Sequence, residues 1–419
     1  MINKIFLILF QYSFYKISSF VNNKFVVNRK MLSTTNQFDI SNNINNINNI
    51  NTNNEFYRFN ILPRLDEPNE TGILTWYPIG FSNDFTLKPK RITIRDINYI
   101  VWKDNYNNYY GLRDCCSHQG SSFQFGEVNK NTISCPYHGY IFDGTNGELI
   151  EIPELHQTPK SNSHNINCYK VVEKGNIIYF NTIPIKNEEI KNKIDESLIF
   201  IEPEYFDHNQ RVVNIKEDFE HYAKFISVNS LDICHIGFVH TFGNKKNPNP
   251  IYNSKIIKLN DTDFHYKIIY EYISGKNSLV NKIYNFNKIT VENEYILPHT
   301  TVARIIFGNF TSTIITHALP VSKFKTKLFV KAYRSYLVYD YKKNNPLFYP
   351  FYKIINNFGD IITKNTMITT IKQDKSIVDF IDKTDYKSMH GSFSIIYDKF
   401  SNHYKNNYKK YYENGHENI

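Results

Sequence analysis

The sequence predicts an α+β protein of two domains, in which a small all-β domain precedes a larger domain built from an antiparallel sheet and helices. Three observations predict this class. Short strand-like runs separated by polar turns fill residues 73–185. Longer β-rich runs follow between residues 254 and 338, and helical patterns flank them at residues 216–242 and 347–380. Strands grouped apart from helices are typical of α+β architecture rather than of a parallel α/β sheet.

The first predicted domain, residues 73–185, consists of short strands. They are Arg91–Ile94, Tyr99–Lys103, Tyr109–Arg113, Tyr169–Val172 and Ile177–Phe180. Turns rich in Asn and Asp separate the first three strands, as in a meander. The last two are joined by Lys174-Gly175-Asn176, which predicts a closing hairpin.

The second predicted domain, residues 186–390, begins after a polar stretch near residues 186–196. Apolar positions at Phe219, Tyr222, Ala223 and Ile226 favour the helix over residues 216–242. The predicted strands are Ser254–Leu259, Phe264–Ile273, Ile289–Leu297, Thr301–Phe307, Ser312–Ala318 and Lys325–Val338. Residues 391–419 are rich in Tyr, Lys and Asn, and we expect a loosely held polar tail there.

The N-terminal residues carry a targeting pattern. Residues 1–38 contain basic residues and no acidic residue, and apolar residues from Phe6 to Val21 recur in steps of three and four. A basic amphipathic start is typical of a mitochondrial transit peptide, so we expect a mitochondrial location. The alternatives are a cytoplasmic protein with a disordered arm and a membrane-associated one, although the apolar run Ile5–Phe10 is too short to span a bilayer. The Asn-rich residues 39–72 predict a disordered linker.

Charge and cysteine usage exclude several classes of protein. The formal net charge is +9, and the acid-free first 38 residues supply more than half of it. The charge therefore gives no reason to expect nucleic-acid binding. The five cysteines show no regular pairing, which argues against a disulfide framework and suits a reducing compartment.

Two cysteines and two histidines occur in alternating pairs in the first domain. The pairs are Cys116-x-His118 and Cys135-x-x-His138, with sixteen residues between them. Two thiolates for one iron and two imidazoles for the other are the ligands of a [2Fe-2S] cluster of mixed type. The alternative is structural zinc, but zinc sites usually pair Cys with Cys and His with His. Cys115 lies beside a ligand position and is the competing thiol, although the Cys-x-His spacing favours Cys116.

This region resembles the Rieske iron–sulfur domain. The likeness covers about 110 residues and includes the two ligand loops together with Trp76-Tyr77-Pro78, Phe142-Asp143-Gly144 and Ile152-Pro153. Tyr140 is a departure, because the family often has Trp at that position. The resemblance implies a [2Fe-2S] cluster held by Cys116, His118, Cys135 and His138.

A second constellation lies in the helical segment of the second domain, where Asn229, Asp232, His235 and His240 follow at intervals of three, three and five residues. Two His and a carboxylate form the facial triad of mononuclear non-haem iron. A spacing of five turns the second His about 140° past a full helical turn. Both can face one metal only if the helix ends or distorts between them, and Gly237 is a plausible place for this. Taken alone, the pair is more often packed or exposed than ligating.

Over residues 73–385 the chain resembles the oxygenase component of Rieske non-haem iron oxygenases, whose second domain carries Asn/Asp-x-x-His-x4-His. The resemblance implies iron bound by His235, His240 and Asp374, with Asp379 and Asp360 as competitors for the third position. It also implies catalytic roles for Asp232 and Asn229. In the family, the carboxylate corresponding to Asp232 lies between a Rieske histidine of one subunit and an iron-bound histidine of the next. A head-to-tail homo-oligomer, most simply a trimer, follows from this arrangement.

The fold, activity and partners implied by the family are further expectations. The second domain should be a curved antiparallel sheet packed on helices, of helix-grip type. The implied cofactors are the [2Fe-2S] cluster and mononuclear Fe(II), with O2 as co-substrate. Because the chain has no Gly-x-Gly-x-x-Gly, NAD(P)H should act only through a separate reductase or ferredoxin.

The implied reaction is hydroxylation, demethylation or desaturation of a small apolar organic compound, sterol-like or aromatic. One competing hypothesis is a Rieske electron-transfer protein without oxygenase activity. The other is a lipid-binding protein with vestigial iron sites.

Overall fold

The computed structural model describes residues 76–155, 162–251, 255–260, 263–276, 278, 288–339, 348–383 and 393–413. These residues all belong to one compact unit, Leu62–Ile419. The expected transit peptide at 1–38 and the Asn-rich linker at 39–72 lie outside the described residues. Among the described helices, none combines the length and the apolar character needed to cross a membrane.

Two antiparallel sheets form the first region. The larger has the strand order β1-β10-β9-β4-β3-β2, and the smaller has the order β5-β6-β7-β8. The strands are β1 (Trp76–Phe81), β2 (Lys90–Ile94), β3 (Ile97–Lys103), β4 (Tyr109–Arg113), β5 (Val128–Asn129), β6 (Thr132–Ser134), β7 (Ile141–Asp143), β8 (Leu149–Glu151), β9 (Cys168–Lys174) and β10 (Ile177–Pro184). Trp102, Phe123 and Phe142 belong to one buried cluster between the sheets, which also contains Cys116 and Cys135. The predicted meander and the β9–β10 hairpin are confirmed.

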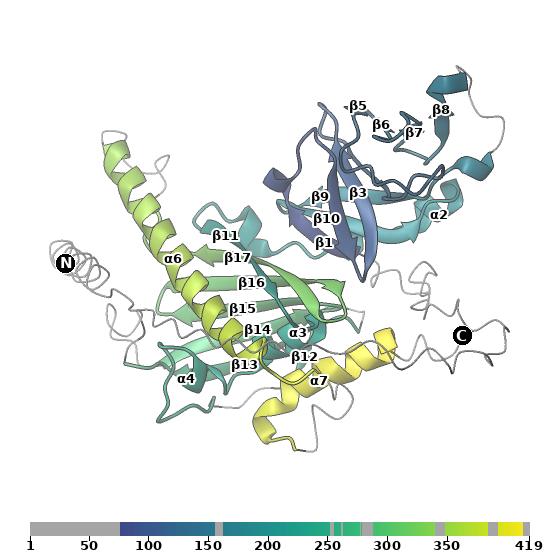
Figure 1. Cartoon of the computed structure of the whole chain (residues 1–419). Helices are drawn as coiled ribbons and strands as arrows, with labels where there is room; N and C mark the ends of the chain where they lie inside the picture. Colours follow the sequence, from purple (N-terminus) through teal and green to yellow (C-terminus); the bar gives the residue numbers. More distant parts are fainter. Residues whose placement is uncertain are drawn as a thin grey trace, which may run out of the picture. The chain divides into compact units, whose positions relative to one another are not determined.

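One seven-stranded antiparallel sheet forms the second region, with the order β11-β17-β16-β15-β14-β13-β12 (Figure 1). Its strands are β11 (Arg211–Phe219), β12 (Ile257–Lys258), β13 (His265–Ile273), β14 (Lys288–Ile296), β15 (Thr300–Phe307), β16 (Phe310–Ser322) and β17 (Lys325–Arg334). The helices are α2 (Glu188–Lys193), α3 (Ala223–Leu231), α4 (Ile236–Val239), α6 (Tyr349–Val378) and α7 (Lys399–Tyr408). The predicted α+β class, with a curved sheet packed on helices, is confirmed.

The two faces of this sheet are covered differently. Because side chains alternate along a strand, Leu328 and Val330 of β17 point to the face where Ile226 of α3 and Ile371 of α6 complete an apolar cluster. Lys331 points to the other face, is 1% exposed, and pairs with Glu202 of the segment that follows α2. A buried ammonium requires such a partner, since an unpaired charge away from water is very unfavourable.

The expected helix over residues 216–242 is wrong in its first part. Residues 211–219 form β11, which pairs with β17 along its whole length. Its buried and exposed positions alternate over much of the strand, with Ile215 buried between exposed neighbours. This is the period of a half-buried strand, and long-range pairing decided the structure. The helical part starts only at Ala223 and stops at Leu231.

The expected polar tail over residues 391–419 is also wrong for its described part. Residues 399–408 form α7, and Lys409–Glu413 add a π-helical turn. Phe400, Tyr404, Tyr408 and Tyr412 recur every fourth residue and are all buried. Their spacing places four aromatic rings on one helical face, which packs into the main core despite the polar composition.

Candidate functional site: two metal-type donor sets

Two short loops with the same backbone conformation carry the first donor set. The amide of Gly120 donates to the carbonyl of Cys116 at 2.8 Å, and the amide of Gly139 donates to the carbonyl of Cys135 at 2.9 Å. Gly120 and Gly139 have φ values of +74° and +76°, which side chains other than glycine rarely adopt. The two turns therefore present their Cys and His pairs in matching ways.

The two thiols of this set lie inside the protein, and the two imidazoles lie close together nearer the surface. Cys116 and Cys135 are 2% and 3% exposed. The rings of His118 and His138 have centroids 4.6 Å apart, His118 being exposed and His138 half-buried. Cys115 is exposed, so it does not compete for the buried position.

The chemistry of these donors fits a mixed-ligand cluster. Burial raises the pKa of the Cys116 thiol to about 11, and the nearby Cys135 adds to this effect. The pair therefore becomes thiolate when a cation compensates the charge. Tyr140 is a neighbour of this site that was not predicted. Its ring stacks on that of His118, with the ring centroids 4.6 Å apart and an interplanar angle of 2°. The sequence indicated it only as a departure from the family pattern.

The second donor set comes from a loop and from α6. α3 ends at Leu231, and His235 and His240 cap the two ends of the single-turn helix α4. The predicted interruption between the two His is therefore present, and Gly237 lies within this single turn. Asp374 lies in the last turns of α6. This helix packs on the same face of the seven-stranded sheet as α3 (Figure 1).

His235, His240 and Asp374 offer ligand atoms that lie within 4.8 Å of one another. Oδ1 of Asp374 is 3.3 Å from Nε2 of His235 and 3.4 Å from Nε2 of His240. This oxygen is buried and accepts no hydrogen bond. Leaving a buried carboxylate oxygen without a donor is unfavourable unless a cation binds there. Two imidazoles and one carboxylate suit mononuclear iron and leave coordination positions open.

The opposite edges of both imidazoles are fixed by hydrogen bonds. Nδ1 of His235 lies 2.9 Å from the backbone carbonyl of Asp232, so this nitrogen is the donor and Nε2 faces Asp374. Nδ1 of His240 lies 3.2 Å from Oε1 of Gln373. Such outer contacts set the tautomer and orientation of ligating histidines. No role was predicted for Gln373, because no sequence pattern links it to a residue 133 positions earlier.

The carboxylate of Asp374 affects the two histidines unequally. Burial lowers the pKa of His235, but the nearby carboxylate of Asp374 outweighs burial and raises the pKa above its ordinary value. For His240, burial lowers the pKa, and Asp374 only partly opposes this. A metal ion bound by both histidines would displace the proton that Asp374 favours on His235.

The structure separates Asp374 from its two competitors. Asp360 is bound by Arg211 and Arg334. Asp379 accepts a hydrogen bond from the amide of Glu220 and pairs with Lys375. Both competitors are thus engaged elsewhere, and neither joins the two histidines.

Asp232 and Asn229 stand beside the second donor set without belonging to it. The Asp232 carboxylate is 39% exposed, and its Oδ2 is 3.8 Å from Nδ1 of His235. Within this chain the imidazole therefore contacts the carbonyl of Asp232 rather than its carboxylate. Asn229 is half-buried in the last turn of α3, where its carbonyl accepts from the amide of Asp232 at 3.3 Å.

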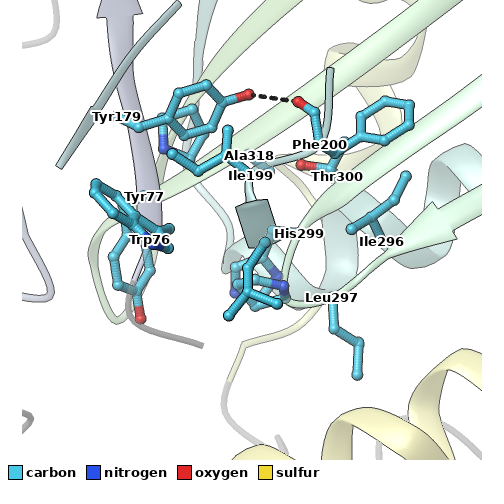
Figure 2. Close-up of a pocket in the computed structure, with 13 residues that line it drawn as sticks. Trp76, Tyr77, Tyr179, Ile199, Phe200, Ile296, Leu297, His299, Thr300 and Ala318 are labelled. Atoms are coloured by element: carbon cyan, nitrogen blue, oxygen red, sulfur yellow. Dashed lines mark hydrogen bonds between the residues drawn. The ribbon is translucent and has the colours of Figure 1, made fainter. Parts of the chain in front are cut away.

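A separate pocket lies between β1 and the turn that joins β14 to β15 (Figure 2). It holds about 30 Å³ of space, which is room for water rather than for an organic substrate. Tyr179 donates a hydrogen bond to the carbonyl of Phe200 at its edge, at 3.4 Å. None of the seven proposed ligands lines this pocket.

Comparison with known proteins agrees with this geometry. Residues 75–170 match the family model of the Rieske [2Fe-2S] domain. The chain is 37% identical over 78 residues to the oxygenase subunit of tert-butanol monooxygenase / tert-amyl alcohol desaturase from Aquincola tertiaricarbonis, covering 19% of this chain and 16% of that protein. It is 23% identical over 167 residues to the oxygenase component of 3-ketosteroid-9-alpha-monooxygenase from Rhodococcus rhodochrous, covering 39% and 43%. The matched stretches thus span less than half the length of these relatives.

The structural likeness extends further along the chain. The structure of dicamba monooxygenase bound to dicamba superposes with a TM-score of 0.65 and 16% identity, covering 82% of this chain and 98% of that one. The fold and the two donor sets together are those of a two-domain protein with a Rieske domain and a second domain whose His235, His240 and Asp374 could hold a metal ion. Residues 75–170 therefore form a Rieske [2Fe-2S] domain, and over most of its length the chain shares the fold of dicamba monooxygenase.

Proposed function

We propose that this chain is the oxygenase component of a multicomponent system that uses O2 to hydroxylate, demethylate or desaturate an apolar organic substrate. The observation that carries the proposal is the buried, hydrogen-bond-free Oδ1 of Asp374 facing Nε2 of both His235 and His240. When bound, the [2Fe-2S] cluster and Fe(II) supply one-electron transfer and the activation of dioxygen.

The residues of this chain hold and orient these groups. Cys116 and Cys135 bind from the buried side, and His118 and His138 bind from the side that a partner can approach. His235, His240 and Asp374 would bind the second metal, while Gln373 and the carbonyl of Asp232 keep the imidazole edges in place. A metal held by these three residues alone would keep coordination positions that this chain does not fill.

The electron donor in this proposal is a separate reductase or ferredoxin. The oligomer is a head-to-tail trimer, in which Asp232 of one subunit meets a Rieske histidine of the next. The 39% exposure of the Asp232 carboxylate supports this, because it is accessible to a neighbour. The location in mitochondria stays a prediction from residues 1–38.

The proposed substrate is a sterol-like or aromatic ring compound. Supporting this are the names of a ketosteroid monooxygenase and of dicamba monooxygenase among the similar proteins. Binding of small charged amines, with no binding of sterols or aromatic acids, would overturn this part of the proposal.

The test is iron and sulfide content with electron paramagnetic resonance, on the whole protein and on His235→Ala. About three irons and two sulfides per chain are expected for the parent protein. His235→Ala should keep the Rieske signal, lose about one iron and lose turnover. Retained turnover in a variant that lacks the second iron would sink the oxygenase mechanism and leave an electron carrier. Zinc without sulfide would remove the cluster assignment.

A further inference from the structure

The first half of α6, residues 349–364, buries polar and small residues and exposes apolar ones, which is the reverse of a helix packed on a core. The residues that it buries against the protein are Asn356, Gly359 and Thr363. The residues that it exposes include Phe351 (40%), Ile354 (66%) and Ile361 (57%). A surface helix of a globular protein normally turns its apolar stripe inward. Here the stripe turns outward.

Polar contacts fix this orientation. Oδ1 of Asn356 accepts a hydrogen bond from the amide of Tyr339 at 2.9 Å, and Nδ2 donates to its carbonyl at 3.0 Å. Asp360 binds both Arg211 and Arg334. Rotating the helix to bury Ile354 would break all of these interactions, so the outward apolar face is a fixed feature of the fold.

The inversion is confined to one half of α6. In the second half, Ile371 and Val378 are buried in the apolar cluster of the sheet, and Met367 and Ile368 pack against it. Figure 1 shows the first turns of α6 reaching past the strands that its later turns cross. One continuous helix therefore packs with its C-terminal half and presents apolar side chains with its N-terminal half.

The charges beside the apolar face have one sign. Lys353 and Lys364 are exposed and are eleven residues apart, which places them within about 20° of each other around the helix. Among residues 349–364, the acidic residue is Asp360, and two arginines neutralise it on the inner side. The outer face is thus apolar and cationic. In a contact of this face with the same face of a second copy these lysines would repel, whereas anionic lipid headgroups complement them.

We propose that residues 349–364 form an interfacial helix that rests on an anionic bilayer surface. Phe351, Ile354 and Ile361 enter the boundary between headgroups and acyl chains, while Lys353 and Lys364 contact lipid phosphates. Neither metal site takes part in this contact, so protein of any iron content serves for its test.

The test uses Phe351→Trp in the full chain as a reporter. The natural tryptophans, Trp76 and Trp102, are 5% and 0% exposed, so lipid quenchers do not reach them. Vesicles of phosphatidylcholine, with and without phosphatidylserine, carry bromine on their acyl chains. The emission of Phe351→Trp should shift to the blue and be quenched at least about twofold more by the anionic vesicles than by the neutral ones. Leu87→Trp is the matched control, because Leu87 is 50% exposed on the first region.

A second set of variants tests the apolar face itself. Ile354→Glu with Ile361→Glu, added to the reporter, should abolish the quenching, whereas Leu87→Glu with Phe206→Glu should leave it unchanged. Equal quenching of Phe351→Trp and Leu87→Trp would overturn the proposal, and this conservative reporter stays informative if the double Glu variant does not fold. A smaller assembly mass for Ile354→Glu/Ile361→Glu in sedimentation, without any lipid quenching of the reporter, would instead assign the face to a second copy of the chain.

Discussion

The proposed role of Asp374 follows from the lack of a hydrogen-bond donor for its buried oxygen. Its Oδ1 atom is shielded from water and accepts no hydrogen bond, although two imidazoles lie within 3.4 Å. Buried carboxylates in folded proteins are almost always paired or coordinated, because desolvation of the charge is costly. Asp360 and Asp379 are paired in this way, and Asp374 is the acidic side chain left for a cation in this part of α6.

We predict that Asp374→Asn lowers the iron content by about one atom per chain and leaves the sulfide content unchanged, since only the second donor set loses its charge. Asp379→Asn, at the C-cap of the same helix, is the matched control and should retain all iron. Elemental analysis with a sulfide assay measures both. The assignment fails if Asp379→Asn loses iron while Asp374→Asn keeps it.

The extent to which residues could be assigned from sequence depended on how far apart they lie. The four cluster ligands could be predicted from the sequence, because a cluster requires these donor types at short spacing in loops. They are Cys116, His118, Cys135 and His138. Asp374 followed only from the family resemblance, since nothing local distinguishes it from Asp379. Gln373 belongs to the segment that resembles the family pattern around Asp374, but no role could be predicted for it, because its contact with His240 forms only after the chain folds.

At the scale of elements, α6 combines two packing modes, and Gly359 marks the polar one. A Cβ at this position would lie 2.4 Å from Cζ of Arg334. That guanidinium is buried and donates to the carbonyls of Tyr336, Leu337 and Asn356. It therefore has no room to move without losing these hydrogen bonds.

We predict that Gly359→Ala lowers the free energy of unfolding by about 1–3 kcal/mol, because overpacking displaces Arg334. The sign is informative, since Gly→Ala inside a helix ordinarily stabilises by up to about 1 kcal/mol. Asn357→Ala, at an exposed position two residues earlier, should not lower stability. Urea unfolding of the three proteins decides the sign, and a more stable Gly359→Ala would contradict the packing described here.

The ion pairs of Asp360 on α6 make the stability of the fold depend on pH. Burial raises the pKa of Asp360, but the hydrogen bonds and charges of Arg211 and Arg334 outweigh burial and hold the pKa below its usual value. A lowered native pKa stabilises the fold above the unfolded pKa of about 4, and this stability is lost as the pH falls through the native value.

The parent protein should therefore exceed Asp360→Asn in melting temperature at pH 7, and the difference should shrink as the pH falls below about 4. Thermal unfolding of both proteins between pH 7 and pH 3 measures it. A difference that stays constant over this range would mean that the ion pairs contribute nothing that depends on the charge of Asp360.

The same scale explains which elements could be predicted. β3, β4, β13 and β15 were found within three residues of their ends, because apolar alternation and flanking turns are local signals. The end of β11, residues 216–219, was assigned to a helix, because the pairing of β11 with β17 brings together segments more than a hundred residues apart. α7 was missed because Tyr counts as polar in a composition rich in Lys and Asn, although its ring buries like an apolar side chain.

Across the whole molecule, the C-terminal aromatic face joins the two regions. Tyr404 donates to the carbonyl of Pro298 at 2.8 Å, within the second region. Four residues further along, the ring of Tyr408 leads to that of Tyr412 at 4.8 Å. Tyr412 contacts the hydroxyl of Tyr77 and the guanidinium of Arg95 in the first region. The last described helix is therefore part of the common core.

We predict that Tyr404→Ala destabilises the protein by about 3–5 kcal/mol, as expected for removing a fully buried aromatic ring. Asn406→Ala, on the exposed side of α7, should change stability by less than about 0.5 kcal/mol. Chemical unfolding of both variants provides the comparison. Equal stability of the two would mean that α7 is not part of the cooperative fold.

Lys331 makes ionic strength a useful probe of this protein. Its ammonium is 1% exposed, pairs with Glu202, and donates to the carbonyl of Gly175 at 2.6 Å in the turn between β9 and β10. Added salt screens charges in contact with water and has little effect on charges sealed away from it. The contact that Lys331 makes between the two regions should therefore be equally stable in concentrated salt and in dilute buffer. If raising the salt concentration lowers the rate of electron delivery, the cause would then be a weaker surface contact with the electron donor. The structure of the chain itself would be the same at both salt concentrations.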